Sequence, residues 1–87
     1  MKAKKMLDKL IDILSDERKA QLKKYSSLKK VLKSLRAEKS RLELEIRQEQ
    51  NEDTRLELES RLKVISAQRK KGIKVLKELK RERKKKA

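Results

Sequence analysis

Leucine recurs every seven residues through the first half of the chain. With Leu28 taken as heptad position d, leucine fills five of the seven d positions in one unbroken register. These d positions are Leu7, Leu14, Gln21, Leu28, Leu35, Leu42 and Glu49. A heptad repeat of this kind predicts a helix that packs against a partner helix.

The second half keeps a heptad repeat in a different register. Its d positions are Leu58, Ile65, Gly72 and Leu79. The two registers differ by two residues, which a coiled coil does not absorb, because its tolerated insertions are of three or four residues. Between the two halves, Asn51 can end a helix in the left-handed conformation, and Thr54 with Glu57 forms a capping box. The pattern predicts two helices joined by a turn at residues 51–54.

In a coiled coil the residues at heptad positions a and d form the buried seam between the two helices. Folding the chain about residue 52 pairs each of these positions in one half with one in the other half, always an a with a d. The pairs are Ile46 with Leu58, Leu42 with Leu62, Lys39 with Ile65, Leu35 with Arg69, Leu32 with Gly72, Leu28 with Leu76, and Tyr25 with Leu79. Because each register is assigned from its own half alone, this agreement favours an all-α antiparallel helical hairpin, a two-helix coiled coil. Lys39 and Arg69 are expected to extend their charged ends to water, and Gly72 is expected to leave a gap that Ile73 partly fills.

The two arms of the predicted hairpin are unequal. We expect the first arm over residues 19–50 and the second over 55–82, followed by a basic C-terminal tail at 83–87. Residues 1–18 then have no partner in their own chain, and we expect an overhanging helix through which the protein forms a dimer or a higher oligomer. The residues expected to mediate self-association are Met6, Leu7, Leu10, Ile11 and Leu14. In an alternative, residues 15–17 cap a new helix and let residues 3–14 fold back, but the continuous register favours the straight helix.

The composition agrees with long helices and excludes several kinds of chemistry. Of 87 residues, 49% are charged, Pro is absent, and Tyr25 is the one aromatic residue, which is typical of coiled coils. High net charge is also typical of disordered chains, but the heptad repeats argue against disorder outside the C-terminal tail. The chain has no Cys or His, so it lacks the usual nucleophile, general base and metal ligand. We expect no catalytic residues, no cofactor and no metal site.

No apolar run is long enough for secretion or for spanning a membrane. We therefore expect a soluble cytoplasmic protein, associated with the nucleoid in a bacterium or placed in the nucleus in a eukaryote.

Charge is divided into blocks along the chain. Residues 19–41 hold nine Lys or Arg and one acid, and residues 61–87 hold thirteen and two acids. Residues 42–60 between them hold seven acids and two arginines. A turn near residue 52 places the two basic blocks side by side as a stem and puts the acidic block at the tip. Such a stem repels itself and attracts a polyanion, of which a nucleic acid backbone is the commonest.

The sequence therefore predicts a small basic coiled-coil protein that binds nucleic acid, with DNA favoured over RNA, for DNA compaction, packaging or RNA chaperoning. With one aromatic residue there is no stacking platform, so binding should be phosphate-directed and weakly sequence-specific. The candidate binding residues lie off the seam and are Lys23, Lys24, Lys29, Lys30, Lys33, Arg36, Arg41, Lys63, Lys70, Lys71, Lys74, Lys77, Lys80, Arg81 and Lys84.

Two other functions remain open at this level. The first is a coiled-coil adaptor, chaperone or scaffold whose stem binds an acidic protein partner, which the acidic tip favours because it would repel nucleic acid. The second is peripheral binding to an anionic membrane, which is weaker because the apolar residues are needed in the seam.

Overall fold

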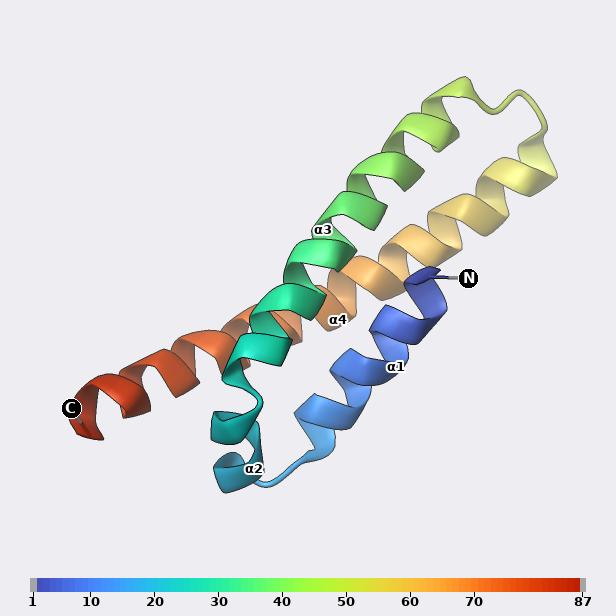
Figure 1. Cartoon of the computed structure of the whole chain (residues 1–87). Coiled ribbons are helices and arrows are strands. Elements are labelled where there is room, and N and C mark those ends of the chain that lie inside the picture. Colours follow the sequence, from blue (N-terminus) through green and yellow to red (C-terminus); the bar gives the residue numbers. More distant parts are fainter. Residues whose placement is uncertain (1, 87) are drawn as a thin grey trace.

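The computed structural model describes residues 2–86, with the side chains of residues 4–84. Its helices are α1 (Lys2–Ser15), α2 (Arg18–Lys23), α3 (Tyr25–Gln48) and α4 (Glu52–Lys86) (Figure 1). The two long helices α3 and α4 pack against each other. This confirms the prediction of an all-helical chain built on a pair of long helices.

The chain reverses direction between α3 and α4 within three residues. Glu49 ends α3 in an extended conformation, with φ −77° and ψ 123°. The Oδ1 atom of Asn51 accepts a hydrogen bond of 3.2 Å from the backbone N–H of Thr54, and the backbone N–H of Asn51 donates to Glu49 Oε1 at 3.0 Å. Asn51 is therefore the N-cap of α4.

The predicted details of this turn are wrong in two respects. No described residue has a positive φ, so Asn51 does not end α3 in the left-handed conformation. Thr54 lies inside α4, which begins at Glu52, so Thr54 is not the cap. The reason is that the Asn51 side chain supplies the acceptor that the first free N–H groups of the helix need.

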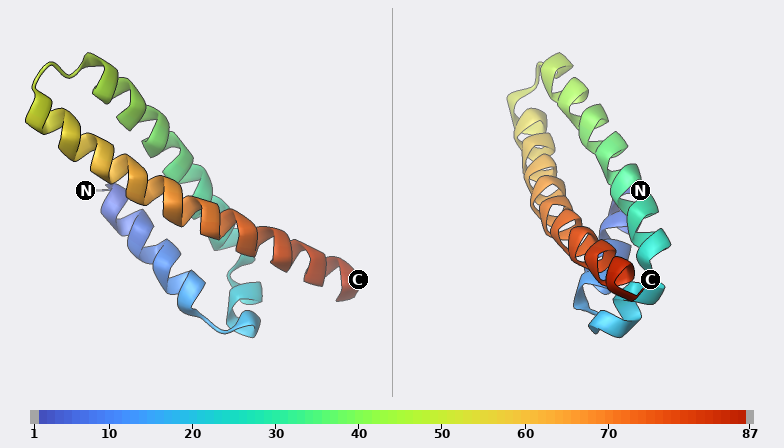
Figure 2. Two further views of the ribbon diagram at one scale, coloured as in Figure 1. Left: turned by 180° about the vertical axis from the view of Figure 1, so that it is seen from behind. Right: turned by 90° about the vertical axis from the view of Figure 1, so that its left-hand side faces the viewer.

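Helix α1 folds back along the α3–α4 pair (Figure 2). Leu10 is fully buried and Ile13 is 4% exposed, while Met6, Leu7 and Leu14 pack against the same core. The prediction that residues 1–18 form a straight overhang without a partner in their own chain is therefore wrong, and the alternative in which this segment folds back is what we observe. Folding back removes the apolar cluster from water, which the straight helix of a single chain cannot do.

Because α1 folds back, it adds nothing to the length of the molecule, which is that of α4. The bundle measures 52 × 18 × 16 Å. At about 1.5 Å per residue, the 35 residues of α4 alone account for this length. Helix α4 continues through Lys86, so the segment predicted as a tail at 83–87 is helical as far as the structure describes it.

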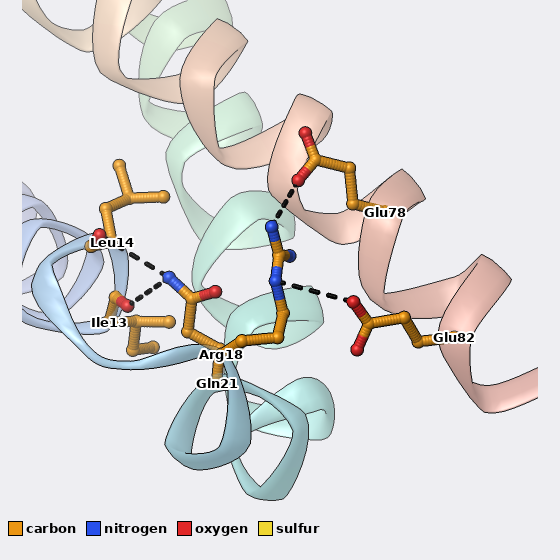
Figure 3. A network of polar contacts seen from close by, with 6 residues as sticks. All are labelled: Ile13, Leu14, Arg18, Gln21, Glu78 and Glu82. Atoms are coloured by element: carbon orange, nitrogen blue, oxygen red, sulfur yellow. Dashed lines mark hydrogen bonds and ion pairs between the residues drawn. The ribbon is translucent and has the colours of Figure 1, made fainter. Parts of the chain in front are cut away.

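A buried glutamine closes the turn between α1 and α2. Gln21 is 5% exposed. Its Nε2 group donates hydrogen bonds to the carbonyl oxygens of Ile13 at 3.0 Å and Leu14 at 3.4 Å (Figure 3). These carbonyls lie in the last turn of α1, where the helix itself supplies no donor. The backbone N–H of Asp16, just beyond the helix, also donates to the Ile13 oxygen at 3.2 Å. The side chain of Gln21 thus caps the C-terminal end of α1.

Ion pairs hold α2 against its neighbours. Arg18 on α2 lies 2.5 Å from Glu78 and 3.6 Å from Glu82, both on α4 (Figure 3). Lys24, between α2 and α3, lies 2.6 Å from Asp16. The short helix is therefore tied at one end to α4 and at the other to the turn that follows α1.

Gly72 lies where α1, α3 and α4 meet. A Cβ atom at this position would lie 2.7 Å from Leu32 Cδ2 and 2.9 Å from Leu10 Cδ1. Leu32 and Gly72 are thus neighbours across the seam, as the register predicts. The predicted gap beside Gly72 is wrong, because Leu32 and the folded-back Leu10 fill the space.

The core is a single apolar cluster that continues from the three-helix region along the α3–α4 seam. Its buried members are Leu10, Ile13, Leu28, Val31, Leu32, Leu35, Leu42, Leu58, Ile65 and Leu79. In the part of the chain that the structure describes, no helix is both long and apolar enough to cross a membrane.

Candidate nucleic-acid interface

Every cation that the sequence predicts as a binding residue is exposed. Five lie on α3 and eight on α4, while Lys23 ends α2 and Lys24 joins α2 to α3. Because the core is built from apolar side chains, the lysines and arginines off the seam remain available to solvent. The fold determines which of these lysines and arginines share a face.

On α4, six of these cations form one stripe. Their spacings are seven, four, three, four and three residues, which keeps them on a single face of a helix. The stripe consists of Lys63, Lys70, Lys74, Lys77, Arg81 and Lys84.

This stripe is turned away from α1. Val64 lines a groove together with Leu7 of α1, which marks the side of α4 that faces α1. Glu78 lies two heptads beyond Val64, on the same side of the helix, and pairs with Arg18 of α2. Lys63 and Lys77 each precede one of these residues by one position, about 100° around the helix at 3.6 residues per turn. Ile65 and Leu79, which follow Val64 and Glu78 by one position, are buried in the core, so the stripe points away from the core as well as from α1.

Helix α3 adds cations to the same side. Lys29, Lys33 and Arg36 are four and three residues apart and share one face. The side of α3 next to α1 is occupied by other residues, because the groove between α1 and α3 is lined by Ser27, Lys30, Val31 and Ser34. We call these three residues, together with the six of the α4 stripe, the basic face.

The remaining six candidate cations lie outside the basic face. Lys24 and Lys30 line the groove between α1 and α3, and Arg41 lines a groove near the start of α1. Lys71 is one heptad beyond Val64 and shares its side of α4, Lys80 occupies the heptad position of the half-buried Ile73, and Lys23 ends α2.

The acids of the two basic blocks lie on the opposite side of the bundle. Residues 19–41 contain only Glu38 and residues 61–87 contain only Glu78 and Glu82. Glu38 lines the groove beside α1 and lies 2.9 Å from Arg41, while Glu78 and Glu82 both pair with Arg18. Each of these acids therefore pairs with a cation outside the basic face.

Tyr25 lies beneath two cations at one end of the stem. The Arg83 guanidinium carbon is 4.2 Å from the ring centroid, and Lys29 Nζ is 5.8 Å from it. The ring is partly buried and also packs against the apolar core, as the sequence predicts. The sequence places Arg83 at heptad position a of the second register, one turn beyond Leu79, although within the segment predicted as a tail. This heptad position is the signal that puts it over Tyr25.

The acidic block lies around the connection between α3 and α4, at the far end of the pair from α2 (Figure 1). Its acids are Glu43, Glu45, Glu49, Glu52, Asp53, Glu57 and Glu59. Among the side chains that the structure describes, no three acids are grouped so as to hold a metal ion.

Comparisons of this chain with protein-family models, with curated proteins and with solved structures find no match.

Proposed function

We propose that the α3–α4 hairpin binds the phosphate backbone of duplex DNA through the basic face. The observation that carries this proposal is the sorting of charge between the two sides of the bundle. Nine cations share the side turned away from α1, and the three acids of the basic blocks are paired on the other side. A surface formed for internal ion pairing alternates its signs instead.

The dimensions of the basic face suit a duplex. From Lys63 to Lys84 the stripe extends over 21 residue steps, or about 32 Å at ~1.5 Å per residue. One turn of duplex DNA is ~34 Å long. Because the cations project from helices that are packed against a common core, their backbone positions are already held in a row, and only the side chains have to be ordered when the complex forms.

Recognition of this kind is weakly sequence-specific. Contacts from Lys and Arg to phosphate position a protein on the duplex without reading base edges. The single aromatic ring, Tyr25, lies beneath Arg83 and against the core, so it is not presented for stacking on a base. The basic face therefore supports a role in covering or compacting DNA.

Charge reversal on the basic face tests the proposal. Changing Lys29, Lys33, Lys70 and Lys74 to Glu should abolish binding to a duplex of mixed sequence, measured by fluorescence anisotropy. For the unchanged protein, contacts to about six to nine phosphates give a slope of log K against log salt of about −5 to −8. Circular dichroism should show unchanged helicity, because all four residues are exposed.

The matched control reverses four exposed lysines outside the basic face, Lys4, Lys5, Lys9 and Lys19. It changes the net charge by the same amount, so binding should weaken only modestly. Equal losses in the two variants would mean that net charge, and not the basic face, drives binding. An absence of binding to the duplex at ~50 mM salt contradicts the proposal outright, and tighter binding to single-stranded RNA of equal length would reassign the ligand.

A further inference from the structure

The fold-back of α1 depends on a very short hinge. Only Asp16 and Glu17 separate α1 from α2. Glu17 has φ −64° and ψ 155°, so its φ is already that of an α-helix and its ψ is the angle that differs from the helical value near −42°. The ψ angle of Glu17 is therefore one of the hinge angles that must change between the folded-back arm and a straight one.

The junction between α2 and α3 is close to helical already. Lys24 has φ −98° and ψ 15°, and its carbonyl oxygen accepts a hydrogen bond of 2.8 Å from the Leu28 N–H, as in a continuous α-helix. If Asp16 and Glu17 both become helical, α1, α2 and α3 can join as one helix.

The sequence supports this straight helix as well as the folded-back one. Leu7 and Leu14 occupy the same heptad position as Leu28 across the hinge. In a straight helix, the carbonyls of Ile13 and Leu14 would accept hydrogen bonds from the backbone N–H groups of residues 17 and 18. They would no longer require the side chain of Gln21, which caps them in the folded-back arm.

In a single chain, a straight arm would expose its apolar face to water. The surface that fits this face is the groove between α3 and α4, and a second copy of the chain has the same groove. The groove of α3 and α4 buries Leu10 completely and leaves Ile13 4% exposed. Leu10 Cδ1 lies 2.9 Å from the place that a Cβ atom on residue 72 would occupy, so the absence of a side chain at Gly72 makes room for Leu10. When α1 of one copy becomes straight, it leaves the groove between its own α3 and α4, and this groove is then free to bind α1 of another copy.

We propose that two copies of this protein exchange α1, each straight arm filling the α3–α4 groove of the other. Every contact that α1 makes with α3 and α4 is remade between chains, so the two states differ mainly at the hinge and in the cost of association. The folded-back state keeps the Gln21 hydrogen bonds and the ion pair between Lys24 and Asp16. This proposal does not depend on DNA binding.

Gln21 controls the balance between the two states. It stands at heptad position d of the straight helix, where a polar side chain is unfavourable, and it supplies the cap of the folded-back arm. Gln21→Leu removes the cap and completes the row of leucines. Because each exchanged dimer contains two hinges, an effect of about tenfold per hinge should tighten dimerisation about a hundredfold, measured by sedimentation equilibrium.

Glu17→Pro provides the lock. Proline adopts the φ and ψ observed at Glu17, but inside a straight helix it removes a backbone donor and clashes with the preceding turn. The double variant Glu17→Pro, Gln21→Leu should therefore return to the monomer mass with unchanged helicity. Lys19→Leu, which adds a leucine at an exposed position of α2, should leave the mass of the unchanged protein as it is.

Two results would overturn the exchange. One is a Gln21→Leu variant that remains monomeric at the concentrations where the unchanged protein does. The other is a dimer that persists when Glu17→Pro is added, because that dimer would not need a straight arm. If Gln21→Leu is insoluble, Gln21→Met removes the same hydrogen bonds and is read by the same criteria.

Discussion

Replacing Gly72 by alanine tests whether three helices meet at this residue. In an exposed helix interior, alanine is more favourable than glycine by about 1 kcal/mol. A gap in the seam, as the heptad pattern suggested, would let the new methyl group add to this gain. The structure predicts the opposite sign, because the methyl group would lie 2.7 Å from Leu32 Cδ2 and 2.9 Å from Leu10 Cδ1.

The magnitude follows from the two effects. Both contacting atoms belong to side chains within the core, since Leu10 is 0% and Leu32 is 4% exposed, so neither methyl group can move without displacing its neighbours. Overpacking of this kind costs about 1–3 kcal/mol, which exceeds the gain in helix propensity. We expect Gly72→Ala to lower the free energy of unfolding by about 1 kcal/mol, and to lower Tm by about 4–8 °C for a domain of this size.

A double-mutant cycle read by thermal unfolding at 222 nm separates the contribution of α1. In a Leu10→Ala background the clash with Leu10 disappears while the one with Leu32 remains, so Gly72→Ala should become less destabilising, a coupling of up to about 1 kcal/mol. Ile11 is on the same helix but 43% exposed, so Ile11→Ala should show no coupling. A rise in Tm for Gly72→Ala, or no coupling to Leu10, would refute the packing of α1 against α4 at this point.

Two further predictions concern local contacts. Asn51→Ala should lower the free energy of unfolding by about 1 kcal/mol because it removes the cap of α4, whereas Thr54→Ala should change it little. If urea denaturation shows the larger loss of stability for Thr54→Ala, Thr54 and not Asn51 is the cap. Arg83→Gln should cost about 0.5–1 kcal/mol and change the tyrosine emission, because its cation lies 4.2 Å from the ring of Tyr25. Lys29→Gln, whose cation is 5.8 Å away, should have the smaller effect, and equal effects would argue against a specific contact.

The long helix pair and the break between its members were predictable because a register slip is a geometric constraint. The apolar seam positions of the first half end at Ile46, those of the second begin at Leu58, and no continuous helix satisfies both registers. The exposure of the candidate cations was predictable because charged side chains off the seam are rarely buried without a partner. The conformation of the turn was harder to predict. Asn51 can end a helix by adopting the left-handed conformation, or it can begin one by accepting a hydrogen bond with its side chain.

The fold-back of α1 was missed because a heptad register specifies which side of a helix is buried and not which helix covers it. A broader apolar pattern held the missing information. Met6, Leu10 and Ile13 are spaced four and three residues apart and lie beside the a and d positions, so the apolar face of α1 is wider than a coiled-coil seam. Ile11, at a seam position, is 43% exposed. Such a wide face is typical of a helix that contacts two neighbours, as α1 does.

The sorting of charge could not be predicted until the side covered by α1 was known, and it has an energetic consequence. Nine cations on one side of a bundle 52 Å long repel one another. Acids on that side would relieve the repulsion, yet Glu78 and Glu82 are placed around Arg18 on the other side. The isolated protein therefore retains a repulsion that a bound polyanion removes. A ligand that binds only the folded state at a hundred times its Kd adds about 2.7 kcal/mol of stability, so the surface that weakens the free bundle is the one through which DNA would stabilise it.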